Sequence, residues 1–101
     1  MVLRTVAYFV NGKKKKIRVK VCNPYLSLGL MFKRNSPPIL FDLKKSKNFT
    51  ISSIFCRPFV AIWLDEEMQA TRILKIRSWN MSFSGFGKYL LEIPLDSLDQ
   101  I

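Results

Sequence analysis

The sequence predicts a mainly β fold: a single-domain β-sandwich or partly open barrel of about seven strands with one short helix. Short segments rich in β-branched and aromatic residues recur along the chain, and turn signals separate them at intervals of about 8 to 12 residues. The chain has 101 residues, of which 49% are apolar. That size allows one modest core but no second one, so we expect a single domain spanning residues 1–101.

The first expected element is a β-hairpin. Residues 2–10 and 17–22 are rich in strand-forming types, and Asn11-Gly12 between them tolerates positive φ at both central positions of a tight turn. From Ile17 to Val21 apolar residues alternate with basic ones. One face of the return strand should therefore be buried, and the other should be wet and positive.

A change of pattern after the hairpin predicts a short helix at about residues 24–33. Asn23 is a good N-cap, and Pro24 suits the first helical position. We expect the helix to plug one end of the sandwich or barrel. The elements expected next are a short strand, a charged turn and another strand, over residues 39–43, 44–48 and 49–56.

The most apolar segment, residues 59–64, is expected to be the central strand. Its side chains are apolar on both alternating faces, which is typical of a strand covered on each side. Trp63 should therefore lie in the middle of the core. The remaining expected elements are a turn, a long strand, a loop with two glycines and a last strand, over residues 65–67, 68–77, 80–87 and 89–93.

Several function classes are disfavoured by what the sequence lacks. No apolar run approaches the ~18 residues of a transmembrane helix, and the N-terminus lacks a signal-peptide pattern, so we expect a cytoplasmic protein without a membrane partner. The chain has no histidine, and Cys22 and Cys56 form no CxxC pair, so we predict no metal site and no cofactor. The acidic run 65–67 is expected to be a solvated turn. Whether the two cysteines are free or paired stays open.

Three apolar segments occur in the order and spacing of a known family. They are Gly29–Arg34 followed by Ile39-Leu40-Phe41, Phe59–Asp65, and Lys88–Pro94. Through them, residues of about 19–94 resemble the family known as domain of unknown function 192, which comprises uncharacterised bacterial and archaeal proteins. The resemblance implies a mainly β fold with no established activity.

The chain departs from this family at its polar positions. Ile51-Ser52-Ser53 stands where the family has Met-Asn-Thr, and Pro58-Phe59-Val60 stands where it has Pro-Leu-Asp. The Gly-Asp turn that closes the family pattern is also absent. A divergent member is implied, in which a polar site shared by relatives would be lost.

Charge is the strongest sign of function. The chain has 17 Lys and Arg against seven Asp and Glu, a net charge of +10. Twelve of the basic residues precede residue 49, opposed there only by Asp42. Such an excess attracts polyanions, of which nucleic acid is the commonest, because each neutralised phosphate releases condensed counterions. The candidate binding residues are Lys13, Lys14, Lys15, Lys16, Arg18, Lys20, Lys44, Lys45 and Lys47.

Two alternatives compete with polyanion binding. Lysines on an outer hairpin also prevent edge-to-edge pairing of sheets. In a different class of function, the domain would bind a protein or a small ligand at an apolar pocket near the 82–87 loop, lined by Phe83 and Phe86. Exposed aromatics would favour single-stranded nucleic acid, but most aromatics are expected in the core; the candidates are Tyr8, Phe9 and Tyr25. Polyanion binding would be distinguished from ligand binding at the pocket by whether the basic residues of 13–20 and 44–47 share one face.

We predict no enzymatic activity and assign no catalytic residues. The commonest general base is missing because the chain has no histidine, and the same absence leaves Cys56 without an imidazole partner. Glu92 is the remaining candidate base. Alternation within 89–93 is expected to turn it away from the apolar side chains and towards solvent.

Overall fold

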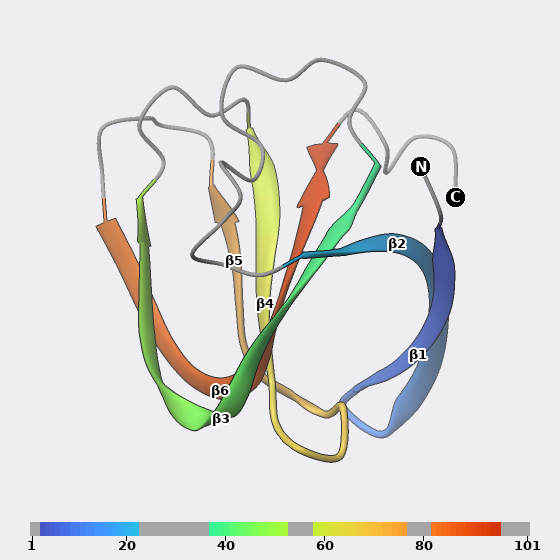
Figure 1. The fold of residues 1–101 in the computed structure, drawn as a ribbon, viewed down its shortest axis with the longest axis horizontal. Helices are drawn as coiled ribbons and strands as arrows, with labels where there is room; N and C mark the ends of the chain where they lie inside the picture. The colour runs from blue at the N-terminus through green and yellow to red at the C-terminus, as the bar shows by residue number, and fades with distance from the viewer. Residues whose placement is uncertain (1–2, 23–36, 53–57, 77–81, 96–101) are drawn as a thin grey trace.

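The computed structural model describes residues 3–22, 37–52, 58–76 and 82–95. These residues form a mixed sheet of six strands (Figure 1). The strands are β1 (Arg4–Val10), β2 (Lys13–Cys22), β3 (Ile39–Ser52), β4 (Phe59–Leu64), β5 (Ala70–Ile76) and β6 (Ser82–Pro94), in the spatial order β1-β2-β3-β6-β4-β5. Strands β2 and β3 run parallel, and the other neighbours run antiparallel. The sheet curls into a half-barrel, so the predicted mainly β, partly open barrel is confirmed.

The two edge strands of the half-barrel meet at one end. Phe9 N donates a hydrogen bond to Met68 O at 2.9 Å, and Phe9 forms an isolated bridge with Gln69. Over the rest of the described residues, no backbone pairing joins β1 to β5. The half-barrel is therefore closed at a single point.

The predicted hairpin is confirmed. Asn11 and Gly12 adopt φ values of 51° and 80°, as a tight turn with two positive-φ positions requires. The paired strands run in register from Arg4 opposite Val19 to Val10 opposite Lys13. The return strand begins earlier than expected, so the lysine run is part of β2 rather than of the turn.

Strands β3 and β6 correct the predicted boundaries. The residues of the expected charged turn, 44–48, lie inside β3. A loop was expected over residues 80–87, but residues 82–87 belong to β6, so this prediction is wrong from residue 82 onward. The two strands bend together (Figure 1). Their pairing is interrupted by a register shift between Asp42 and Lys47, where Lys44 has a φ of 72°, and it resumes at Lys47 opposite Gly87. Among the described residues, six strands therefore take the place of the expected seven, because the strands expected at 39–43 and 49–56 belong to one strand, β3.

Beyond the bend, residues 47–52 of β3 and 82–87 of β6 form an outer arm that folds back over β4. Two positions of this arm require glycine, because the backbone of the arm lies very close to β4. A Cβ at Gly85 would lie 2.5 Å from the Trp63 ring, and a Cβ at Gly87 would lie 2.5 Å from Leu64 O. The glycines that resembled loop residues in the sequence instead allow the outer arm to lie against β4.

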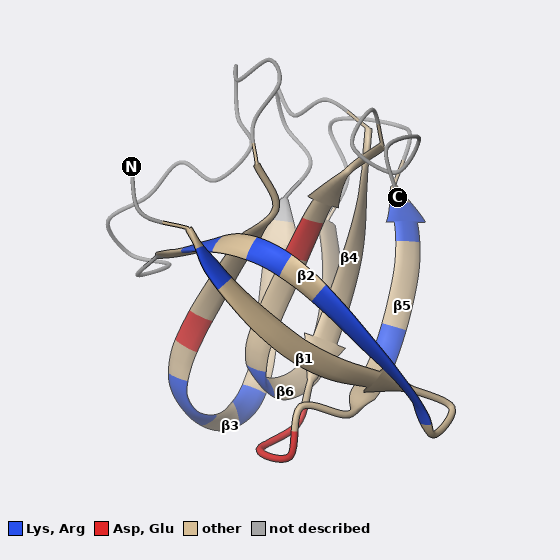
Figure 2. Ribbon diagram, turned by 90° about the vertical axis from the view of Figure 1, so that its right-hand side faces the viewer, with Lys and Arg blue, Asp and Glu red and all other residues tan. Residues whose placement is uncertain are grey.

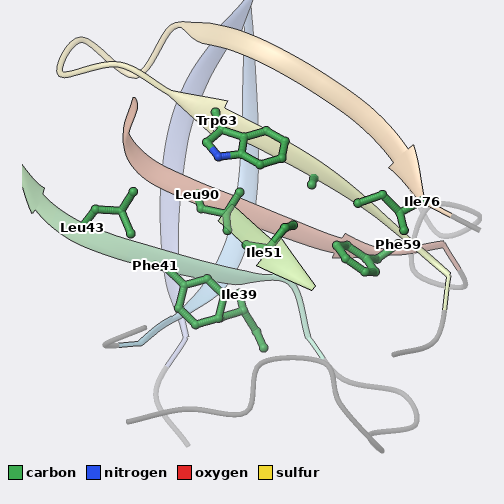
Figure 3. Close-up of a cluster of buried hydrophobic side chains, with 9 residues drawn as sticks. Ile39, Phe41, Leu43, Ile51, Phe59, Trp63, Ile76 and Leu90 are labelled. Carbon is green, nitrogen blue, oxygen red and sulfur yellow. The ribbon is translucent and has the colours of Figure 1, made fainter. Parts of the chain in front are cut away.

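Two buried clusters cover opposite faces of the central strands. The Trp63 cluster lies under the outer arm and consists of Ile39, Phe41, Leu43, Ile51, Phe59, Ala61, Trp63, Ile76 and Leu90 (Figure 3). The hairpin cluster lies under β1 and β2 and consists of Tyr8, Val19, Leu40, Ile62, Leu64, Leu91 and Ile93. Strand β4 contributes to both clusters, so its prediction as a strand covered on each side is confirmed. Its expected central place in the sheet is wrong, because β4 lies beside the edge strand β5.

Some expectations lie outside the described residues. They include the helix at 24–33, Tyr25, Cys56 and Trp79. Among the residues that the structure does describe, no helix is long and apolar enough to cross a membrane.

Candidate functional site

Alternation along β2 separates its apolar and basic side chains. Val19 is fully buried in the hairpin cluster, and Ile17 packs against the same cluster. The residues between and beside them face away from the core. They form a row that we call the basic row, which consists of Lys14, Lys16, Arg18 and Lys20. Successive members are spaced by about 6.8 Å, because a strand rises about 3.4 Å per residue.

The basic row carries uncompensated positive charge. Its neighbours across the strand pair are Phe9, Ala7 and Thr5, opposite Lys14, Lys16 and Arg18. None of these neighbours is acidic, and no member of the row forms an ion pair with a described residue. Lys14, Lys16 and Arg18 are exposed and Lys20 is half-buried, so the charges are open to solvent and to a charged partner.

Lys13 and Lys15 have a different setting. They pair with Val10 and Tyr8, on the side of β2 that faces the core, but both lie near the hairpin turn and are exposed. Tyr8 is buried in the hairpin cluster, and burial raises the pKa of its phenol above the ordinary value. Tyr8 is thus not available to stack on a base.

The lysines of the β3 bend lie in a mixed-charge setting. Lys44 Nζ approaches Asp42 Oδ2 at 3.9 Å, and Lys47 Nζ lies 5.8 Å from the centroid of the Phe49 ring. Lys45 is exposed. Part of the positive charge of Lys44, Lys45 and Lys47 is therefore offset locally.

The acidic turn between β4 and β5, residues 65–67, lies between the basic row and the bend (Figure 2). On one side, Ser46 Oγ donates to Glu66 Oε1 at 3.5 Å. On the other side, the residue that follows the turn, Met68, accepts the hydrogen bond from Phe9. The candidate basic residues of 13–20 and 44–47 thus form two groups separated by carboxylates, not one continuous face.

The acidic turn is held by its own hydrogen bonds. Asp65 Oδ1 accepts from the backbone N–H groups of Glu67 and Gln69, each at 2.9 Å. Within the described parts of the chain, no group of three or more cysteine and carboxylate side chains is arranged to hold a metal ion. The acidic run therefore forms a turn, as expected.

Phe83 and Phe86 point to opposite faces of the outer arm. Phe83 packs against the Trp63 cluster, whereas the Phe86 side chain is 51% exposed. The carbonyl of Phe86 accepts a hydrogen bond from Thr71 Oγ1 at 2.5 Å, which ties the arm to β5. Since the segment is a strand, the two side chains lie on opposite faces of it.

The structure corrects the expected exposure of Glu92. It is only 7% exposed, whereas alternation was expected to turn it to solvent. Its partners on the two neighbouring strands are Ile39 of β3 and Ala61 of β4, both members of the Trp63 cluster. The face expected to be exposed to solvent is the face of the Trp63 cluster, to which the outer arm contributes Ile51. Burial raises the pKa of the Glu92 carboxyl to about 7.

Comparison with known proteins finds likeness in fold alone. No family model matches the chain, and no curated protein matches it. The structure is similar to that of a "putative transcription regulator" from Sinorhizobium meliloti 1021, with a TM-score of 0.76 and 15% identity over 97% of this chain and 84% of that one. It is also similar to a protein of unknown function from Novosphingobium aromaticivorans, with a TM-score of 0.72 and 14% identity over 97% of this chain and 77% of that one.

Proposed function

We propose that this protein is a non-enzymatic domain that associates with nucleic acid through the basic row of β2. The observation that carries the proposal is the pattern of exposure along the strand. Val19 and Ile17 anchor one face of β2 in the core, and four cations project from the other face without an acidic neighbour across the hairpin. An uncompensated cationic row favours phosphate binding because it gains from counterion release without first breaking ion pairs.

A fold comparison gives weak independent support. The Sinorhizobium protein has a name that proposes a role in transcription regulation, and its fold matches this one over most of both chains. At 15% identity the likeness carries the fold and not the binding residues. It makes nucleic acid a reasonable first polyanion to test.

The proposal predicts a salt-dependent affinity for nucleic acid. The logarithm of the binding constant should fall linearly with the logarithm of salt concentration, and the dissociation constant for arbitrary duplex should be about 10⁻⁴ to 10⁻⁶ M at physiological salt. Changing Lys14 and Lys16 together to alanine should lower the slope by about 2 without changing sequence preference. Fluorescence anisotropy across a salt series measures both quantities.

A matched control uses the β3 bend. The double change of Lys44 and Lys45 to alanine removes the same charge from a site beside Asp42 and the acidic turn. Its salt slope should stay close to that of the native chain. Equal salt slopes for the two double variants would mean that only the net charge of the protein determines its binding. A binding constant that does not change with salt concentration would contradict the proposal.

Edge protection by lysine is the competing explanation of the row. It predicts that the Lys14 and Lys16 variant aggregates more readily but binds nucleic acid as the native chain does. Light scattering of the same samples used for anisotropy separates the two explanations. Loss of binding in a variant that stays monomeric favours the proposal.

We also propose that the chain is a divergent member of the domain of unknown function 192 family. Two of the three motifs that carry this resemblance fall on described strands: Phe59–Leu64 forms β4, and the segment that ends at Pro94 lies in β6. These motif positions pair with each other, from Phe59 opposite Pro94 to Leu64 opposite Tyr89. Side-by-side pairing of the two motifs is a reason for both to recur together in one family.

The non-enzymatic part of the proposal predicts no turnover of phosphoesters, esters or peptides above background. Those reactions need a positioned base or a metal-bound water, and the partners of Glu92 across the sheet are apolar. The informative variant is Val60→Asp, which introduces the aspartate that the related family carries at this position. Hydrolysis of a substrate panel by that variant or by the native chain, abolished by Glu92→Gln, would overturn this part.

A further inference from the structure

Over most of its length, the hairpin that carries the basic row is a two-stranded ribbon at the edge of the sheet. Strand β2 pairs with β3 only from Lys20 to Cys22, so within the described residues Lys13–Val19 has β1 as its single neighbour. The outer edge of β1 has one bridge to another described residue, from Phe9 to Gln69, beside the hydrogen bond from Phe9 N to Met68 O. Figure 1 shows this ribbon arching away from β4 and β6. Its outward face is open to solvent at Thr5, Lys14, Lys16 and Arg18, which are exposed.

The dimensions of such a ribbon match one nucleic-acid surface. Paired strands lie about 4.8 Å apart, and the major groove of B-form DNA, about 12 Å wide, admits a two-stranded ribbon. The minor groove is about 6 Å wide and does not. In A-form RNA the major groove is deep and narrow, so side chains cannot reach into it. The shape of the grooves therefore allows such a ribbon to bind duplex DNA in preference to duplex RNA.

The side chains of the outward face also favour a duplex over a single strand. Thr5 and Ala7 are small and lie opposite Arg18 and Lys16, so the longer cationic side chains can project past them. Single-strand sites need exposed aromatic side chains on which bases stack. Here Tyr8 is buried, and Phe9, the one aromatic among the described residues of the outward face, is half-buried.

We infer that the partner of the basic row is B-form duplex DNA, with the β1–β2 ribbon lying in the major groove and its long cationic side chains extending from the inserted face to the phosphates that border the groove. This inference rests on the proposed function and adds to it the form of the nucleic acid. The ribbon enters with its outward face first, while the opposite face stays packed on the hairpin cluster.

The experiment compares three probes of one sequence: duplex DNA of about 20 base pairs, the corresponding single-stranded DNA, and duplex RNA, each at about 50 mM salt. The native chain should bind the duplex DNA at least about tenfold more tightly than the other two, because only its major groove accepts a ribbon. Equal affinity for all three would overturn the inference but leave the proposed function standing. No binding to any probe would overturn both.

A variant that changes shape without changing charge sharpens the test. Thr5→Trp places a large ring beside Arg18 on the exposed outward face, where a strand accommodates an aromatic residue. It should obstruct entry into the groove and offer a stacking platform, so the preference for duplex over single-stranded DNA should fall or reverse. The control is Thr50→Trp, at an exposed position of the outer arm, which should keep the native preference. An unchanged preference in Thr5→Trp would contradict the placement of the ribbon in the groove.

Discussion

Replacing Trp63 with alanine is expected to lower the free energy of unfolding by about 3 to 5 kcal/mol. The side chain is fully buried in the Trp63 cluster. Its indole Nε1 donates to Phe49 O at 3.1 Å, and Gly85 lies directly against its ring. The ring therefore joins β4 to the outer arm, and truncation removes both the apolar contacts and the partner of a backbone carbonyl. Such a loss is a large part of the stability of a domain of this size.

Chemical denaturation measures the effect, with Phe86→Ala as the control. The Phe86 side chain is half exposed on the outer arm, so its removal should change stability by no more than about 0.5 kcal/mol. Trp79, which lies outside the described residues, is predicted from the sequence to cost less than Trp63. If Trp79→Ala lowered the denaturation midpoint more than Trp63→Ala, the assignment of β4 as the central strand of the core would fail.

Ionisation of Glu92 is expected to make the fold less stable as the pH rises. The carboxyl has an ordinary pKa of 4.5 in the unfolded chain and a pKa of about 7 when buried. Between these values the unfolded chain loses its proton while the folded chain keeps it. The stabilising contribution is therefore complete below pH 4.5, declines up to about pH 7 and is absent above it. The total change is about 3 kcal/mol, at about 1.4 kcal/mol for each pKa unit.

The variant Glu92→Gln tests this pH dependence, because the amide has a similar shape and does not ionise. We expect it to be more stable than the native chain at pH 8 and to approach the native stability below pH 4.5. Glu67→Gln, on the exposed acidic turn, serves as the control and should follow the native curve. A parallel stability curve for Glu92→Gln and the native chain between pH 4.5 and 8 would show that the Glu92 carboxyl is not desolvated as described.

The parts of the fold that were predictable depend on local signals. The hairpin is specified by Asn11-Gly12, where two adjacent residues accept positive φ. Strand β4 is specified by six consecutive apolar residues, which suit a strand covered on both faces. Each of these features can be recognised without knowing what lies across the sheet.

The bend of β3 and β6 could not be predicted because it depends on distant partners. Lys44-Lys45-Ser46-Lys47-Asn48 has the composition of a turn, yet β3 resumes its pairing with β6 at Lys47 opposite Gly87. Gly85 and Gly87 resemble loop glycines in the sequence, whereas their role is close approach to Trp63 and Leu64. Glu92 is buried because both faces of β6 contribute to a buried cluster, which is why alternation alone predicted the wrong exposure for that residue.

The candidate site was predictable in part. Alternation along the return strand indicated a wet, positive face with Arg18 and Lys20, and the structure extends that face to Lys14 and Lys16. The separation of this face from the β3 bend was not predictable. It depends on the acidic turn, which contacts the bend through Glu66 and is joined to β1 through Met68.

Nuclear magnetic resonance mapping of the bound nucleic acid tests the basic row most directly. Backbone amide shifts of the labelled chain are followed during titration with duplex DNA at about 50 mM salt. Binding by the basic row predicts that the largest changes fall on Lys14–Lys20 and on their partners Thr5 and Ala7, with small changes at Lys44–Lys47. Changes that are largest at the β3 bend, or equal at every lysine of the described chain, would contradict it.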